Sequence, residues 1–229
     1  MQKNVMLTNR LLMTAKFVYG GGTLIDVGTD HAYLPVSLIQ NGLIKKAVAC
    51  DIHQKPLENA RKTVESYNLS DKITLCISDG LQNINPDEAD EIVIAGMGGT
   101  LISEIIEKAP WLKNKKKHLI LQPQTKAEQL RTFLYNGGYE ILEEKAVFEG
   151  QRLYIAMHAA FSGEKRDFSL SDTYIGGFRD KKDDAACEYI KRQARHIELK
   201  IQGCKISGDE LNEKLLTAVL KDVNEVINA

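Results

Sequence analysis

The chain of 229 residues lacks long apolar runs, paired cysteines and a surplus of charge of either sign. No run approaches the roughly eighteen consecutive apolar residues of a membrane-spanning helix, so none is expected. The four cysteines, Cys50, Cys76, Cys187 and Cys204, form no CxxC pair and lie at no metal-ligand spacing from a histidine. Their scatter argues against a disulfide scaffold and against a zinc or other metal site, and indicates a reducing, cytoplasmic location.

Basic residues are concentrated locally, although the chain as a whole is nearly neutral. Thirty Lys and Arg against 31 Asp and Glu give a net charge of −1, which does not by itself indicate a nucleic-acid-binding protein. The first nineteen residues hold three basic residues and no acid, and residues 163–205 hold ten basic against eight acidic residues. Such patches can guide a polyanion, although each can also be an ordinary solvated surface. The candidates for contacting phosphates are Lys3, Arg10, Lys16, Arg179, Lys191, Arg192 and Arg195.

Short β-branched runs alternate with helical patterns from Thr23 to Asn136. Nearly continuous apolar strands separated by helices are typical of a parallel sheet covered on both faces. Two further strands, joined at Glu149-Gly150, are predicted to form an antiparallel hairpin. The sequence therefore predicts an α/β, Rossmann-like fold with a mostly parallel seven-stranded sheet. The expected strands are 23–27, 46–51, 72–77, 91–96, 118–123 and the two arms of 139–161, and the expected helices are 33–41, 55–66, 99–108 and 125–136.

The last part of the chain is predicted to form two amphipathic helices. Its first apolar stripe consists of Ala186, Ile190, Ala194, Ile197 and Ile201, and its second runs from Leu211 to Val226. Gly203 is expected to end the first helix, and Ser207 or Asp209 to cap the second. We therefore predict one domain over residues 1–162 and a coiled-coil-like helical hairpin over residues 163–229.

Acids and glycines follow the first four predicted strands. Asp26 lies at the end of the first strand and Gly28 follows it, Asp51 ends the second strand, and Asp79 with Gly80 follows the third. The Gly-rich loop AGMGGT follows the fourth. The carboxyl ends of parallel strands meet at one edge of a sheet, and this edge is where such folds bind a cofactor. An acid at the end of the second strand is typical of a residue that accepts hydrogen bonds from ribose hydroxyls.

The turn after the first strand differs from that of a NAD-binding protein. It reads GTDHAY instead of GxGxxG, and Asp30 stands where the second glycine would lie. A carboxylate there would repel a pyrophosphate, but it suits a cationic ligand such as S-adenosylmethionine, which carries a sulfonium and an α-amino group. Four acids at successive crevice positions favour this cofactor, although acids at strand ends also cap helices.

The segments DVGTDHAYLP, IVIAGMGGTLI and LQPQ resemble the bacterial tRNA (adenine-22, N1)-methyltransferase family, and the resemblance extends along the whole chain. It implies a class I methyltransferase fold, S-adenosylmethionine as the donor, tRNA as the partner and a helical hairpin that helps to hold it. Gln124 stands where members of that family tend to carry Asn. The implied cofactor-binding residues are Asp26, Gly28, Asp30, His31, Asp51, Ile52, Asp79, Gly80, Gly96 and Met97.

The chemistry of adenine N1 indicates which residues could be catalytic. N1 attacks with an in-plane lone pair, so the reaction needs positioning and desolvation more than a base. The product ring is cationic, and Asp30 is the first candidate to stabilise it, with His31 or Tyr33 contacting the adenine or the methionine end. N6-methyltransferases usually carry an (N/D)PPY loop where this chain has AGMGG. Because AGMGG offers no side-chain acceptor for an exocyclic amine, it fits methylation of a ring nitrogen better. Met97 could contact a target adenine that has flipped out of the RNA stack, or it could simply fill the core. Likewise, His31 could instead cap a helix, and Tyr33 could be an ordinary packing residue.

Two other functions are compatible with the sequence. The same fold could methylate rRNA, protein or a small molecule. A non-catalytic nucleotide-sensing or RNA-binding module would use the hairpin for dimerisation, but the four crevice acids argue against it.

Overall fold

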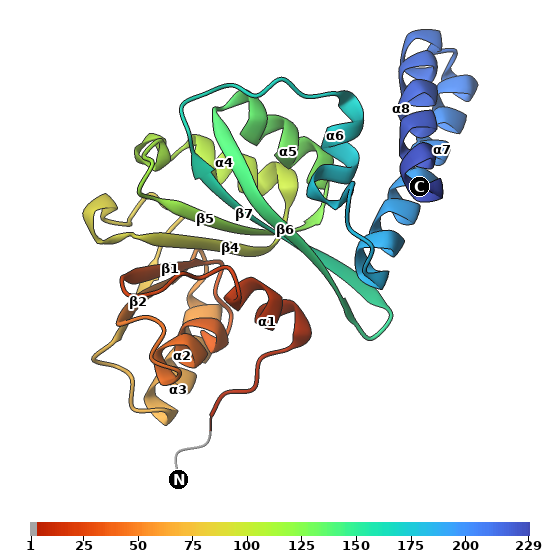
Figure 1. Ribbon diagram of the computed structural model, residues 1–229. Helices are drawn as coiled ribbons and strands as arrows, with labels where there is room; N and C mark the ends of the chain where they lie inside the picture. Colours follow the sequence, from red (N-terminus) through yellow and green to blue (C-terminus); the bar gives the residue numbers. More distant parts are fainter. Residues whose placement is uncertain (1–3) are drawn as a thin grey trace.

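The computed structural model describes residues 4–229, so Lys3, a predicted phosphate contact, lies outside the described residues. Its centre is a seven-stranded sheet in the order β3-β2-β1-β4-β5-β7-β6 (Figure 1). The first five strands are parallel, and β7 pairs antiparallel with both β5 and β6. The predicted α/β, Rossmann-like fold class is therefore confirmed. The strands are β1 (Thr23–Val27), β2 (Lys46–Asp51), β3 (Ile73–Ile77), β4 (Glu91–Gly98), β5 (His118–Thr125), β6 (Tyr139–Glu149) and β7 (Arg152–Phe161).

Helices cover both faces of this sheet. One face carries α1 (Asn9–Ala15), α2 (Tyr33–Gln40) and α3 (Gln54–Ser66), and the other carries α4 (Gly99–Glu107) and α5 (Ala127–Asn136) (Figure 1). Two short 3₁₀ turns, η1 (Pro86–Glu88) and η2 (Pro110–Leu112), lie in the loops flanking β4 and α4. The four helices predicted between residues 33 and 136 are confirmed, with ends shifted by at most two residues.

Successive residues of each central strand enter two different apolar cores. Leu24 of β1 packs in the core under α1, α2 and α3, whereas Ile25 packs in the core under α4 and α5. In β4, Val93 belongs to the first core, and Ile92 and Ile94 belong to the second. Because both faces are buried, the strands are apolar without the alternation of a half-exposed sheet.

Helix α1 was not predicted, because its seven residues are too few to show a clear helical period. Met13 and the following Phe17 anchor it in the core. The Glu149 carboxylate accepts a hydrogen bond of 3.0 Å from the Arg10 backbone N–H, and this bond lowers the pKa of Glu149. The helix thereby carries Arg10 to the carboxyl edge of the sheet.

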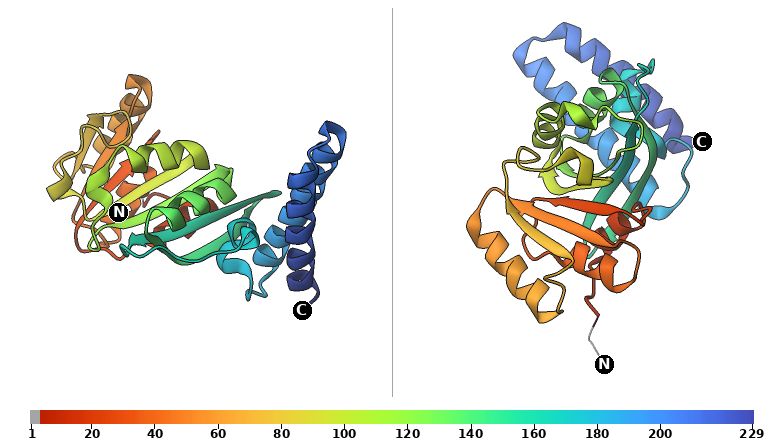
Figure 2. Two further views of the ribbon diagram at one scale, coloured as in Figure 1. Left: turned by 90° about the horizontal axis from the view of Figure 1, so that it is seen from above. Right: turned by 90° about the vertical axis from the view of Figure 1, so that its left-hand side faces the viewer.

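The C-terminal helices α7 (Asp184–Ser207) and α8 (Glu210–Asn228) form the predicted hairpin, which projects from the sheet domain (Figure 2). The predicted stripe from Ala186 to Ile201 is buried, as are Val219 and Val223 of α8. Leu211 and Leu215 were also assigned to the second stripe, but they are 71% and 48% exposed near the tip of the hairpin. Among the described residues, no helix is long and apolar enough to cross a membrane.

The prediction that Gly203 ends the first hairpin helix is wrong. Helix α7 continues through Gly203 to Ser207 and ends at Gly208, whose φ of 73° is the left-handed conformation that a glycine adopts at low cost. Asp209 then caps α8, since its side chain accepts a hydrogen bond from the Asn212 backbone N–H. An exposed glycine within a long helix costs only about 1 kcal/mol, which the packing of α7 on α8 can offset.

A buried ion pair joins the hairpin to the sheet domain. Arg131 of α5 and Glu144 of β6 are both fully buried, and their side chains are 2.8 Å apart. The same guanidinium donates to the carbonyl oxygens of Thr173 and Tyr174 in α6 (Leu170–Ile175) and to the Tyr189 hydroxyl of α7, at 2.8 to 3.0 Å. Burial alone would lower the pKa of Arg131, but the adjacent Glu144 carboxylate more than offsets this, so the net shift is upward.

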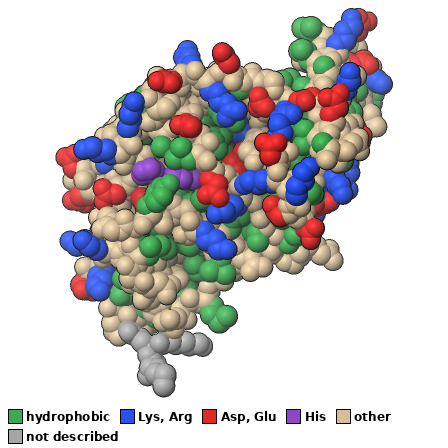
Figure 3. All heavy atoms as spheres, viewed as in Figure 1, with side chains coloured by type: hydrophobic (Ala, Val, Ile, Leu, Met, Phe, Trp, Pro, Cys, Tyr) green, Lys and Arg blue, Asp and Glu red, His purple; other side chains and the backbone are tan. Residues whose placement is uncertain are grey.

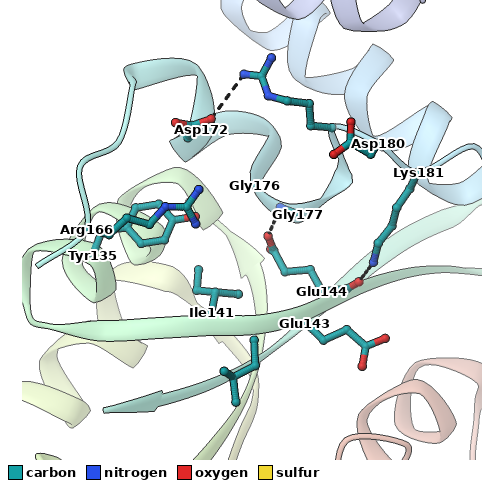
Figure 4. A pocket seen from close by; sticks show the side chains of 12 residues that line it. Tyr135, Ile141, Glu143, Glu144, Arg166, Asp172, Gly176, Gly177, Asp180 and Lys181 are labelled. Carbon is teal, nitrogen blue, oxygen red and sulfur yellow. Dashed lines mark hydrogen bonds and ion pairs between the residues drawn. The ribbon is translucent and has the colours of Figure 1, made fainter. Parts of the chain in front are cut away.

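The Glu144 carboxylate also fixes the turn that leads into α7 (Figure 4). The carboxylate accepts a hydrogen bond from the Gly177 backbone N–H within η3 (Gly176–Phe178). The backbone carbonyl of Glu144 accepts another from the Lys181 ammonium. A Cβ atom on Gly176, where φ is 51°, would lie 2.1 Å from a Glu144 carboxylate oxygen. The close approach of this turn to Glu144 therefore requires glycine.

We predict that Arg131→Met lowers the free energy of unfolding by about 3–5 kcal/mol, because Glu144 is left buried without its cation. Lys205→Gln, which removes an exposed partner of Glu213, should cost less than about 1 kcal/mol. Urea denaturation of both variants measures the difference. A loss below 1 kcal/mol for Arg131→Met would contradict the assigned role of this pair.

Candidate active site

The predicted crevice acids lie at the carboxyl ends of neighbouring parallel strands. The sheet order places β1 between β2 and β4, and β3 beyond β2. Asp26, Asp51 and Asp79 therefore come from three adjacent strand ends at one edge of the sheet. Their relative placement is as expected from the spacing of the acids along the chain.

The turn after β1 packs directly on the end of β4, which the structure extends to Gly98, so that part of the predicted Gly-rich loop is strand. The backbone N–H groups of Gly28 and Thr29 donate to the Cys50 carbonyl at 2.8 and 3.0 Å. Gly28 has a φ of 77°, and a Cβ there would lie 2.1 Å from Cε of Met97. Met97 therefore lies across the turn, where any larger residue at position 28 would displace it. It also packs against the core under α4 and α5, in agreement with the alternative of a packing role.

A cavity of about 450 Å³ opens where β1 and β4 end. Residues of α1, the turn after β1, the start of α2 and the end of β4 form its walls. Beyond it, the ends of β2 and β3 carry four further predicted cofactor residues, namely Asp51, Ile52, Asp79 and Gly80. The cavity is lined by seven of the predicted site residues, Arg10, Asp26, Gly28, Asp30, His31, Tyr33 and Gly96.

Two exposed isoleucines accompany the acids at the ends of β2 and β3. Ile52 and Ile77 are 54% and 52% exposed, and Ile77 is the register partner of Asp51. Ile77 was not predicted as a site residue, because it looks like an ordinary strand residue in the sequence. Apolar side chains beside carboxylates suit a ligand with a flat apolar ring and hydroxyl groups.

Asp26 is the most perturbed acid of the site. Burial raises its pKa to about 6, and a hydrogen bond with the Thr29 side chain offsets part of this shift. A buried carboxylate is costly unless it is paired, and a bound cation would supply the pairing. The environment of Asp26 therefore favours a ligand with a positively charged group.

Asp30, His31 and Tyr33 form a connected cluster at the mouth of the cavity. His31 Nε2 is 3.4 Å from the Asp30 carboxylate, and its ring stacks on that of Tyr33 with centroids 5.0 Å apart. Asn59 Nδ2 of α3 donates to Asp30 at 3.3 Å. The N-cap of α2 is Ala32, which makes no side-chain cap bond, so His31 does not cap this helix. Tyr33 is 43% exposed, which is more than a pure packing residue needs.

Arg10 lies in the cavity wall rather than on an open surface. Its Nη1 donates to Gln122 Oε1 at 3.2 Å, and that oxygen also accepts the Gly96 backbone N–H at 3.1 Å. Arg10 Nε is buried and has no hydrogen-bond partner among the described residues. Its guanidinium lies 5.5 Å from the ring centroid of Tyr154. The sequence reasoning missed Gln122, although a glutamine inside the apolar strand HLILQP is a visible signal.

The other predicted phosphate contacts lie outside this cavity. Arg179 bridges Asp222 of α8 and Asp172 of α6, at 2.9 and 3.4 Å. Arg192 and Arg195 both pair with Glu188 of α7. Lys16 and Lys191 are exposed. Acidic and basic side chains alternate over the face shown in Figure 3, without a large region of one sign. Within residues 4–229, no three His, Cys, Asp or Glu side chains are grouped to hold a metal ion.

Comparison with curated proteins gives relatives that are similar to part of the chain. The chain is 37% identical to the tRNA (adenine(22)-N(1))-methyltransferase of Bacillus subtilis over 148 residues, 65% of this chain and 62% of that relative. It is 34% identical to a putative tRNA methyltransferase of Mycoplasma pneumoniae over 132 residues, 58% of this chain and 60% of that relative. The aligned part thus spans about three fifths of these curated relatives.

Solved structures resemble almost the whole chain, including the hairpin. A putative tRNA (m1A22) methyltransferase of Streptococcus pneumoniae, in complex with S-adenosyl-L-methionine, is 31% identical with a TM-score of 0.84 over 97% of this chain and 100% of that chain. The Bacillus subtilis m1A22 tRNA methyltransferase is 28% identical with a TM-score of 0.86 over 97% and 99%. The family model described as a methyltransferase domain matches residues 7–157. Because this match covers well over half of the sequence, the chain belongs to the methyltransferase domain family.

Proposed function

We propose that this chain transfers the methyl group of S-adenosylmethionine to N1 of an adenine in tRNA, at the position numbered 22, in the cytoplasm. The observation that carries the proposal is one cavity lined by the buried acid Asp26 and by the exposed cluster of Asp30, His31 and Tyr33. The similarity to the tRNA (adenine(22)-N(1))-methyltransferase of Bacillus subtilis and to the putative tRNA (m1A22) methyltransferase of Streptococcus pneumoniae supports the acceptor and its position.

The residues at the sheet edge fit S-adenosylmethionine. The buried Asp26 carboxylate would pair with the α-amino group, and Asp51 would accept hydrogen bonds from the ribose. Ile52 and Ile77 would contact the adenine faces. Glycines at these strand ends leave room for the ligand beside the backbone. At Gly96, for example, a Cβ would lie 3.3 Å from the Arg10 guanidinium and would narrow the cavity. When bound, the cofactor supplies an electrophilic methyl group on its sulfonium.

The cluster at the cavity mouth would position the acceptor adenine. The stacked rings of His31 and Tyr33 are nearly parallel, with 6° between their planes, and would offer a flat ring face to a base that has left the RNA stack. N1 needs no base, because its lone pair is free near neutral pH. The exposed Asp30 carboxylate would stabilise the positive charge that the ring acquires. These residues thus orient the nucleophile and stabilise the product charge.

The hairpin would hold the tRNA outside the cavity. We propose that the chain divides into a catalytic domain over residues 1–162 and a tRNA-binding hairpin domain over residues 163–229. The cations Lys16, Lys191, Arg192 and Arg195 remain the candidates for phosphate contacts, whereas Arg10 lies in the cavity wall. Phosphate contacts position the RNA without reading its sequence.

A competition between acceptors tests the proposed substrate class. Bulk tRNA, rRNA and protein are mixed with labelled S-adenosylmethionine and the enzyme, then separated. The proposal expects the label in tRNA. Label in rRNA or protein would show methyltransferase activity but would contradict tRNA as the acceptor. A chain that binds the cofactor and labels none of the three would support the non-catalytic alternative.

We predict that Asp30→Asn lowers kcat by about 10- to 100-fold, because the cationic ring loses its counter-charge. The Kd for S-adenosylmethionine, measured by calorimetry, should rise by a smaller factor, about two- to threefold, because an exposed carboxylate contributes less to binding the cationic cofactor than to the transition state. Glu58→Gln, an exposed acid of α3, is the matched control and should leave both values unchanged. Wild-type kcat in Asp30→Asn would contradict the role of Asp30.

We predict that binding of S-adenosylmethionine weakens as the pH falls below about 6. The pKa of Asp26 is raised to about 6, so its carboxylate is ionised above that pH and progressively protonated below it. The Kd should then rise about tenfold per pH unit. Asp26→Asn should bind weakly at all pH values with a flatter profile. Calorimetry between pH 5 and 8 measures both, and an unchanged profile in Asp26→Asn would contradict the assignment.

A further inference from the structure

A second cavity, of about 350 Å³, lies between the junction of β5 with α5 and the first hairpin helix, α7. We call it the β5–α7 groove. One wall is formed by the end of β5, the N-cap residue Lys126 and the start of α5, and the other by Arg192, Gln193 and His196 of α7. Its apolar lining includes Leu153 and Ile155 of β7. The groove therefore joins the end of the catalytic sheet to the projecting hairpin.

The groove adjoins the active-site cavity at Gln124. This residue is exposed and lines both cavities. Its Nε2 atom would lie 3.8 Å from a Cβ built on Gly96, which places it at the end of β4. A polymer chain could thus have one unit in the active site and the next unit in the groove, with Gln124 between them.

The charges of the groove suit an anion. Lys126, Arg192 and His196 line it, and its single carboxylate, Glu128, already pairs with Lys200 at 3.2 Å. Arg192 pairs with Glu188 at 2.9 Å, but its side chain is 40% exposed. Such exposed pairs contribute little, so a phosphate can compete for the guanidinium. The apolar floor would meanwhile contact a ribose or a base.

The backbone is strained where β5 joins α5, in the wall of the groove opposite α7. Lys126 adopts a φ of 54°, which is unusual for a residue with a side chain. Its carbonyl oxygen would lie 2.3 Å from a Cβ on Gly99, so only glycine at position 99 lets the starts of α4 and α5 approach this closely. The second half of the AGMGG motif thus shapes the groove, whereas Gly96 shapes the active-site cavity. Strain of this kind is typical of functional loops.

We propose that the β5–α7 groove binds the nucleotide of the tRNA strand next to the target adenine. Its phosphate would lie against Arg192 and Lys126, and its sugar or base on Leu153 and Ile155. This inference rests on the proposed tRNA methyltransferase activity. The groove gives the enzyme a hold on the strand beside the extruded base, which helps to offset the few kcal/mol that extrusion costs.

Charge-removing substitutions on the hairpin test the groove directly. Arg192→Gln should raise the KM for tRNA about 5- to 10-fold and reduce the salt dependence of tRNA binding by about one phosphate contact, with the Kd for S-adenosylmethionine unchanged. Arg195→Gln, which removes the other partner of Glu188 but does not line the groove, should have a smaller effect. Lys214→Gln of α8 is the control for charge loss alone. Equal effects of Arg192→Gln and Arg195→Gln would overturn the proposal in favour of a diffuse cationic face.

Replacing single phosphates of the tRNA by neutral methylphosphonates shows which phosphate contacts Arg192. A tRNA ligated from two halves carries a methylphosphonate on the 5′ or the 3′ side of the target adenine. One of the two should raise the wild-type KM, and the same substitution should cost nothing further in Arg192→Gln. Additive effects at both positions would overturn the groove assignment. If wild type methylates tRNA but Arg192→Gln equals wild type, only the groove proposal fails, whereas no methylation of tRNA by wild type overturns the proposed function as well.

Discussion

The buried guanidinium of Arg131 determines how the hairpin stands relative to the active site. It pairs with Glu144 of the sheet and donates to two carbonyls of α6 and to the Tyr189 hydroxyl of α7. Because a charge buried in this way must keep its partners, the junction tolerates little rotation of α7. Tyr189 also lines the β5–α7 groove, so the same contact fixes the wall of the proposed nucleotide site.

Backbone strain accompanies the site at two equivalent places. Ala32 and Lys126 both have a φ of 54°, and each stands at the N-cap of the helix that follows a central strand. The Ala32 N–H donates to the Thr29 hydroxyl at 3.1 Å, and the Lys126 carbonyl lies where a Cβ on Gly99 would meet it. One strained turn shapes the active-site cavity and the other shapes the groove. Both therefore belong to the surface that would meet the tRNA.

The sequence was sufficient to predict the sheet, the helices α2 to α5 that cover it and the acids of the crevice. Continuous apolar strands follow from burial on both faces, and parallel strands bring Asp26 and Asp51 to one edge. The hairpin was predicted from its apolar stripe, but its turn was misplaced because Gly203 is tolerated inside a well-packed helix. The roles assigned to the individual site residues, and the division of the chain after Ser162, stay predictions.

Contacts between distant residues could not be predicted. Nothing in a local pattern pairs Arg10 with Gln122, which lies 112 residues further along the chain. The Arg131 cluster likewise depends on how α5, β6 and α7 meet in space. Ile77 shows its exposure only once β3 is placed at the edge of the sheet, beside Asp51. The sequence thus revealed the chemistry of the crevice better than the residues that support it.

The most direct test of the account is the identity of the methylated nucleoside. Unmodified tRNA is incubated with the enzyme and S-adenosylmethionine, digested to nucleosides and analysed by mass spectrometry with chromatographic standards. We expect 1-methyladenosine, from a single position that stops reverse transcription at residue 22 of the tRNA. N6-methyladenosine or a methylated guanosine would contradict attack by the adenine ring nitrogen.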